Sequence, residues 1–201
     1  SYPAVTDGIV KQAQIPLPAL SEQARIVAIL DAAEQLRRLR EQADKRTEDL
    51  IPALFHEMFG DQERFGTNAL GELLQPIDNG WSPVCKKDPA GANEWGVLKL
   101  GAVTTGTYIA TENKALPEGV SPRPNIEVRP GDVLFTRKNT KELVAAIAYV
   151  WETRPMLLLS DLIFRLRPNE GIEPLYLAHA LKQSTKRREI QSLASGAAGS
   201  M

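Results

Sequence analysis

The chain has 201 residues, of which 43% are hydrophobic, and a formal net charge of −1. This length can bury one proper core beside a long appended element, but hardly two large domains. No apolar run reaches the length of a membrane span, and the N-terminus lacks the basic and apolar blocks of an export signal, so we expect a cytoplasmic protein with no membrane contact. The single cysteine, Cys85, excludes an internal disulfide.

Charge is distributed unevenly along the chain. Residues 1–63 hold 7 Lys/Arg and 11 Asp/Glu, whereas residues 64–201 hold 17 and 14. The second part is therefore the more basic one. This modest asymmetry supports a basic face there, of the kind that nucleic acid requires, without establishing it.

Residues 21–59 have the periodicity of one very long helix, which would span roughly 57 Å. Ahead of it, residues 15–20 are proline-set and extended, and Ser21 offers an N-cap oxygen. Gly60 is the expected end of the helix. Pro52 predicts a kink or a break into two helices near its position.

The apolar stripe of this helix predicts two contact patches separated by a charged middle, residues 37–46. A helix longer than its own domain needs another surface, so we expect a bundle with a second chain or domain. An ordinary amphipathic helix folded back on its own domain is the alternative. The predicted partner-interface residues are Ile26, Ile29, Leu30, Ala33, Leu36, Leu50, Ile51, Leu54 and Met58.

The remainder of the chain has the pattern of a mixed domain with short strands. Half of the 28 Gly and Pro residues fall between Pro76 and Gly131, so loops dominate there. The predicted fold class is mixed α/β (α+β), with a lead-in and long helix in residues 1–63 and a mixed domain in residues 64–201. Strands are predicted at 96–100, 108–111, 132–137, 144–151, 156–159 and 162–167, and helices after Pro174 and at about 184–194.

Catalytic motifs are incomplete throughout. The sequence HEMFG at His56 lacks the second histidine of a zinc protease, and residues 101–107 imitate a phosphate loop without its lysine. Glu112 and Lys114 fit a magnesium-dependent nuclease, but Asp88, the nearest acid upstream, lies in a Pro/Gly loop rather than at a strand end. We therefore expect no catalysis, no metal and no cofactor, and keep the nuclease as a minor alternative.

Basic and amide side chains gather directly after the strand predicted at residues 132–137. Arg and Asn can read guanine and adenine edges, and Lys and Thr suit phosphates, although a solvated turn explains the same residues equally well. Two further clusters are weaker candidates. One follows a tryptophan that is either exposed or a core lid, and the other lies at the start of the last helix. The candidate DNA contacts are Arg137, Lys138, Asn139, Thr140 and Lys141, then Lys86, Lys87 and Trp81, and last Lys186, Arg187 and Arg188.

Several blocks, in order along nearly the whole chain, resemble the specificity (S) subunits of Type I restriction-modification systems. IPLPALSEQARIVAILDAAEQL and LIPALFHEMFGD resemble the conserved helical region of that family. The second part of the chain resembles one target recognition domain of that family, through the blocks VLKLGAVTTGTY, RPGDVLFTRKNTKELVAAIAYV, LLLSDLIFRLRP and RREIQSLASGAAGSM. Two positions depart from the family pattern: Ala145 stands where glycine is common, and Pro52 interrupts a helix that is commonly free of proline.

The resemblance implies a subunit without catalysis of its own, which recognises double-stranded DNA and directs modification (methyltransferase) and restriction subunits to it. In that family each recognition domain reads half of a bipartite target, and the long helices space two such domains and dock the modification subunits. Members have two of each part and this chain has one. It is therefore expected to be a half-length unit that homodimerises through the long helix, or a fragment or permuted unit. A helix-mediated assembly module that binds protein instead of DNA is the alternative.

Overall fold

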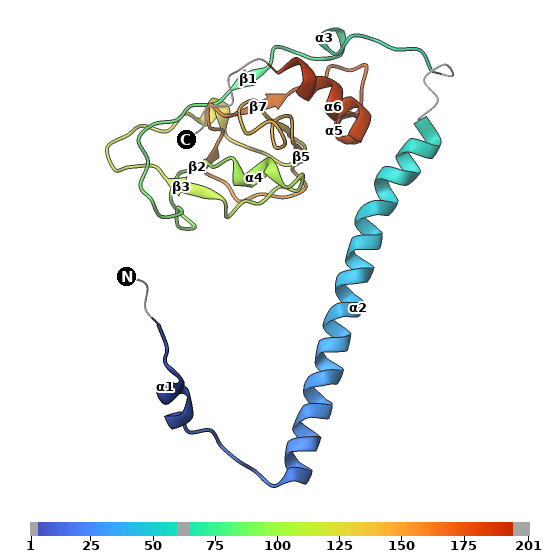
Figure 1. Cartoon of the computed structure of the whole chain (residues 1–201). Helices are drawn as coiled ribbons and strands as arrows, with labels where there is room; N and C mark the ends of the chain where they lie inside the picture. The colour runs from blue at the N-terminus through green and yellow to red at the C-terminus, as the bar shows by residue number, and fades with distance from the viewer. Residues whose placement is uncertain (1–3, 60–64, 195–201) are drawn as a thin grey trace. The chain divides into compact units, whose positions relative to one another are not determined.

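The long helix predicted from the sequence is one continuous element, α2 (Leu20–Phe59), in the computed structural model of the chain (Figure 1). The structure describes residues 4–59 and 65–194. With 40 residues, α2 is roughly 60 Å long. A short helix, α1 (Asp7–Gln12), precedes it. Gly60, the expected end of the long helix, lies outside the described residues, as does the C-terminal motif from residue 195 onwards.

Two details of α2 differ from the sequence prediction. Ser21 lies inside the first turn, because the Ala19 carbonyl accepts the amides of Glu22 and Gln23 and so starts the helix one residue earlier. The sequence predicted a kink or a break into two helices near Pro52. The break is wrong, since the helix continues through this residue. Pro52 is therefore accommodated inside α2, although a proline in a helix costs about 3 kcal/mol.

The predicted interface residues of α2 are exposed, whereas Phe55 of the same helix contacts the ring of Tyr176, with 5.4 Å between the ring centroids. None of the helix is buried, and the large side chains of the predicted interface are exposed by 41% at Ile26 to 68% at Leu36. The charged middle, in contrast, has partners on the helix itself, because Glu34 pairs with Arg37 at 2.8 Å and with Arg38 at 3.0 Å. Within the described segments, no helix is long and apolar enough to cross a membrane.

The chain divides into two compact units, Ser1–Leu50 and Ile51–Met201. The domain boundary predicted after residue 63 falls at the edge of the stretch that the structure does not describe, and it stays a prediction. The second unit is a mixed α+β fold, as predicted. Its elements are α3 (Leu70–Leu73), β1 (Asp78–Asn79), β2 (Gly96–Leu98), α4 (Gly101–Thr104), β3 (Asn113–Ala115), η2 (Pro124–Ile126), β4 (Val133–Thr136), β5 (Ile147–Tyr149), β6 (Leu157–Leu158), β7 (Ile163–Leu166), α5 (Pro174–Lys182) and α6 (Ser184–Leu193).

The strands of the second unit form two small sheets. One has the order β1-β7-β4-β5, with every neighbouring pair antiparallel. In the other, β2 lies between β3, which is antiparallel to it, and β6, which is parallel. Helix α5 packs on β4 and β5 through the apolar face expected from the sequence, with Leu177, Ala178 and Leu181 buried. This packing fixes the sheet from which the basic segment at residue 137 emerges.

Most predicted strands are confirmed with shorter bounds, but the strand at residues 108–111 is wrong. The strand of this region is β3, further along the chain. Its first residue, Asn113, is buried. The side-chain Oδ1 of Asn113 accepts the backbone amide of Ala90 at 2.8 Å, and its Nδ2 donates to the Ala110 carbonyl at 2.9 Å. A buried polar residue leaves no apolar signal. Strand β5 begins later than residue 144 because Ala145 has a φ of 58°, outside the extended region.

Candidate nucleic-acid interface

The basic segment after β4 forms a closed loop, residues 137–143. Thr136, the last residue of β4, is buried and bonds to the residues that follow the loop. The Thr136 carbonyl accepts the amide of Ala145 at 3.0 Å, and its hydroxyl accepts the amide of Ala146 at 2.9 Å. At the far side, the Thr140 carbonyl accepts the amide of Val144 at 2.9 Å. The ends of the loop are thus fixed, while Arg137, Lys138 and Lys141 are exposed.

The Arg137 side chain is held in place by two residues of the neighbouring strands. Its guanidinium lies over the ring of Phe164, with 4.9 Å from Cζ to the ring centroid. Its Nη1 donates to Oδ1 of Asn79 at 3.2 Å. Stacking on an aromatic face and one side-chain bond leave further N–H groups of the guanidinium for an outside acceptor. This geometry suits a side chain that reads a base edge or grips a phosphate.

Asn139 is engaged inside the protein. Its Nδ2 donates to Oγ1 of Thr104, in α4, at 3.3 Å, and its Oδ1 accepts the amide of Thr140 at 2.9 Å. A bidentate contact with adenine needs both of these atoms. In this conformation Asn139 therefore orients the loop against α4, and reading a base would require it to exchange both bonds.

The exposed charges of the loop are not all positive. Within the described residues, Lys138 and Lys141 form no ion pair and remain available to phosphates. Glu142 lies beside them, and its pKa is lowered by a bond from its own backbone amide first, and then by the Thr140 hydroxyl. Its carboxylate is therefore ionised at neutral pH. A DNA strand that meets the lysines has to avoid this carboxylate.

Side chains of helix α6 donate hydrogen bonds to backbone carbonyls at the end of the loop. Gln191 Nε2 donates to the carbonyls of Glu142 at 3.1 Å and Val144 at 3.0 Å, and Arg187 Nη2 donates to the Glu142 carbonyl at 3.2 Å. The structure thus brings the 137–141 and 186–188 clusters together. The cations of α6 are otherwise engaged: Lys186 pairs with Glu189, and Arg188 bonds the carbonyl of Ser184.

The second basic cluster belongs to the other sheet. Lys86 is bonded through its amide to the Ala115 carbonyl of β3, its Nζ lies 3.7 Å from Glu118, and Lys87 is exposed. Trp81 is half-buried and packs against the core of this sheet, with the Arg123 guanidinium 4.2 Å from its ring centroid. Of the two interpretations of Trp81, the core lid is the one that this packing favours.

A buried charge cluster near the start of β4 was not found from the sequence. Arg165 of β7 is only 3% exposed, and it donates to carboxylate oxygens of Asp78 at 2.7 Å and Asp132 at 3.1 Å. Its Nη groups also reach the carbonyls of Glu127 and Asn125. Strand β1 is held to β7 by this cluster. The signal in the sequence is an arginine at an inward position of a predicted strand, because a buried guanidinium requires acceptors inside the protein.

Glu112 and Lys114, the pair considered for a nuclease, are not arranged as a metal site. Glu112 Oε2 pairs with Lys99 Nζ at 3.0 Å. Across residues 4–59 and 65–194, no three His, Cys, Asp or Glu side chains gather as metal ligands would. Glu112 is thus neutralised by Lys99, and Lys114 has no ion pair in the part of the chain that the structure describes.

Comparison with known proteins finds similarity over most of the chain. No protein-family model matches the chain. Over 133 residues, 65% of this chain, it is 37% identical to the Type I restriction enzyme EcoEI specificity subunit of Escherichia coli, and it covers 22% of that protein. A chain solved in work on complex assembly and conformational transition of the type I R-M system matches 96% of this chain, with a TM-score of 0.52 and 27% identity. The chain is similar to Type I specificity subunits in sequence and in fold.

The match to Type I specificity subunits confirms the resemblance seen in the sequence. The HsdS subunit of Thermoanaerobacter tengcongensis overlaps 98% of the chain at 27% identity, with a TM-score of 0.47. This chain spans about half the length of the two solved chains, 49% and 48%, and a smaller share of the Escherichia coli subunit. In the residues that the structure describes, the chain has one long helix and one mixed domain.

Proposed function

We propose that this chain is a sequence-specific DNA-recognition unit of a Type I restriction-modification complex, without catalysis of its own. The observation that carries the proposal is Arg137, held by Phe164 and Asn79 at the end of β4, in a chain that matches specificity subunits. A preoriented guanidinium among exposed lysines combines a base reader with phosphate contacts. Its partners would be double-stranded DNA, a modification subunit and a restriction subunit.

The exposed stripe of α2 supports a second element of the proposal, a homodimer. One recognition domain reads one half of a bipartite site, so two copies joined through their long helices would read both halves. The exposed side chains of the predicted interface, such as Ile26, Leu36 and Met58, are the surface that such a bundle would bury. The same stripe would serve the alternative, an assembly module that binds protein and not DNA.

Selection from a pool of random duplexes tests the proposal. The full chain is mixed with the modification subunit of its own system, and the recovered DNA is sequenced. We expect enrichment of a two-part sequence. Recovery of random sequence would favour the assembly module, and metal-dependent cleavage by the chain alone would favour the nuclease.

Mass measurement in solution tests the homodimer. We expect a dimer for the parent chain and for Gln35→Glu, which adds a charge away from the stripe, and a monomer for Leu36→Glu, which places the same charge on it. A strict monomer in the parent chain would remove the second recognition domain from the proposal.

A further inference from the structure

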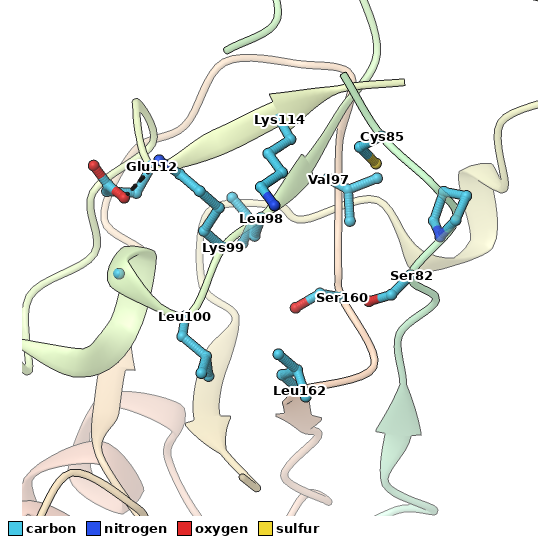
Figure 2. A pocket seen from close by; sticks show the side chains of 12 residues that line it. Ser82, Cys85, Val97, Leu98, Lys99, Leu100, Glu112, Lys114, Ser160 and Leu162 are labelled. Atoms are coloured by element: carbon cyan, nitrogen blue, oxygen red, sulfur yellow. Dashed lines mark ion pairs between the residues drawn. The ribbon is translucent and has the colours of Figure 1, made fainter. Parts of the chain in front are cut away.

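A cavity of about 430 Å³ opens beside the three-stranded sheet (Figure 2). Val97 and Leu98 of β2 form an apolar wall, and a few polar groups enter from other segments. Apolar walls with a small number of placed polar groups are typical of ligand sites, and the volume lies within their usual range. Two of these polar groups, at Ser160 and Lys114, have no partner within the described residues.

Ser160 is the more informative of the two. It is 3% exposed, and its hydroxyl oxygen has no hydrogen-bond partner in the part of the chain that the structure describes. The other serine of the cavity, Ser82, is bonded to the carboxylate of Asp161. A buried hydroxyl without a partner is unfavourable for folding and calls for an explanation. A ligand that accepts the hydroxyl proton supplies one.

Lys114 adds an unbalanced positive charge. The other lysine of the cavity, Lys99, is neutralised by Glu112, whereas Lys114 forms no ion pair with any described residue. In Figure 2 the Lys114 side chain extends down into the cavity, and Glu112 turns away toward Lys99. Burial raises the pKa of the Cys85 thiol and the Lys114 ammonium opposes this shift, so the ammonium lies near the Cys85 wall.

The cavity adjoins the base of the 137–143 loop. Leu162 lines the cavity, and its carbonyl accepts the amide of Arg137 at 3.0 Å. On the other side, Gly101 lines the cavity and begins α4, whose Thr104 receives the bond from Asn139. A DNA strand whose bases meet Arg137 would therefore pass close to the cavity.

We infer that this cavity is a phosphate subsite for the DNA strand, with Lys114 as the charged contact and Ser160 as the hydroxyl donor. The inference rests on the proposed function and adds a site to it. Phosphate oxygens take bonds from lysine and from hydroxyl groups, and such contacts fix the register of a protein on DNA without reading bases. A free nucleotide offers the same phosphate, so the test separates the two sources.

Because a phosphate contact is independent of sequence, random duplex DNA is a sufficient probe. We expect Lys114→Ala in the full chain to bind it about 3- to 10-fold more weakly at low salt, with the slope of log K against log salt smaller by about one. Ser160→Ala should also bind several-fold more weakly, yet unfold at the same or a higher temperature, because an unpaired buried hydroxyl is removed. A serine with a structural role alone would leave DNA affinity unchanged.

A charge-neutral control uses the paired groups of the same cavity. The double variant Lys99→Gln with Glu112→Gln removes an ion pair without changing net charge, and it should bind duplex DNA like the parent. If Lys114→Ala and Ser160→Ala bind random duplex DNA like the parent while Arg137→Ala loses affinity for the selected sequence, the subsite is wrong and the proposed function stands. Thymidine monophosphate binding that depends on Lys114, without any effect on duplex binding, would assign the cavity to free nucleotides and overturn the inference. Failure of the parent to bind any DNA, with its modification subunit present, would reject both proposals.

Discussion

Asn79 and Phe164 occupy paired positions on β1 and β7, and both contact the side chain of Arg137. The neighbouring pair consists of Asp78, the residue before Asn79 on β1, and Arg165, the residue after Phe164 on β7. A buried ion pair joins these two side chains. The contacts that orient the Arg137 guanidinium are therefore placed by the same strand pairing that the buried charges secure. Preorganisation of this kind lowers the entropy lost when a side chain binds.

Arg137 and Lys141 are predicted to act differently on DNA. Arg137→Ala should cost about 1–3 kcal/mol on the selected sequence and relax base preference, because a base contact is lost. Lys141→Ala should weaken binding to all sequences alike and reduce the salt slope by about one. Titration of selected and random duplexes at several salt concentrations measures both. An equal loss on the two kinds of DNA for Arg137→Ala would reject base reading by this residue.

Phe164 should influence the same readout without touching DNA. Phe164→Leu keeps an apolar side chain on β7 but removes the aromatic face, so base preference should fall by less than in Arg137→Ala while affinity for random duplexes is retained. A double-mutant cycle with Arg137→Ala measures the coupling. Strictly additive effects of the two changes would show that the stacking has no part in recognition.

Gln191 is predicted to hold the 137–143 loop closed. Gln191→Ala removes two donors from the carbonyls of Glu142 and Val144, each worth about 0.5–1.5 kcal/mol. Amide hydrogen exchange at Ala145 and Ala146 should become roughly 10-fold faster, since local opening becomes easier by about 1.4 kcal/mol. Ser192→Ala, whose hydroxyl bonds only within its own helix, is the matched control. Unchanged exchange in Gln191→Ala would assign the loop's closure to the bonds of Thr136, Thr140 and Arg187 instead.

The glycine that is common in the family at the position of Ala145 has a backbone explanation. Ala145 has a φ of 58° and is 1% exposed, and Ala146 is equally buried. Ala145→Gly relieves about 1–2 kcal/mol of left-handed strain, against about 0.8 kcal/mol for the lost methyl and about 0.5–1 kcal/mol for added chain freedom, so the net change should lie within about 1 kcal/mol of zero. Ala146→Gly also loses a methyl and gains chain freedom, but it relieves no left-handed strain. Urea unfolding should show Ala146→Gly as the less stable variant, and equal losses would contradict the strain.

The sequence predicted elements better than it predicted partners. The length of α2, the apolar face of α5 and the strand before Arg137 follow from periodicity, which depends on nearby residues. The double engagement of Asn139 could not be foreseen, because Thr104 is 35 residues away and becomes a neighbour only when α4 folds onto the sheet. Likewise, Asn79 and Arg137 are 58 residues apart. Side chains in a recognition loop look free in a sequence until such long-range bonds are known.

Arg165 is predicted to be the most sensitive polar residue of the second unit. Arg165→Met leaves the carboxylate of Asp132 without its partner and that of Asp78 with the more exposed Arg167 alone, which should cost about 3–5 kcal/mol in unfolding free energy. Arg167 pairs with the same Asp78 at 2.6 Å, but its side chain is 45% exposed, so Arg167→Met should cost less than about 1 kcal/mol. Denaturant unfolding compares the two. Equal costs would mean that burial does not set the strength of this cluster. If Arg165→Met still folds, loosened pairing of β1 with β7 should also release Asn79 from Arg137, so base preference would weaken while binding to random DNA persists.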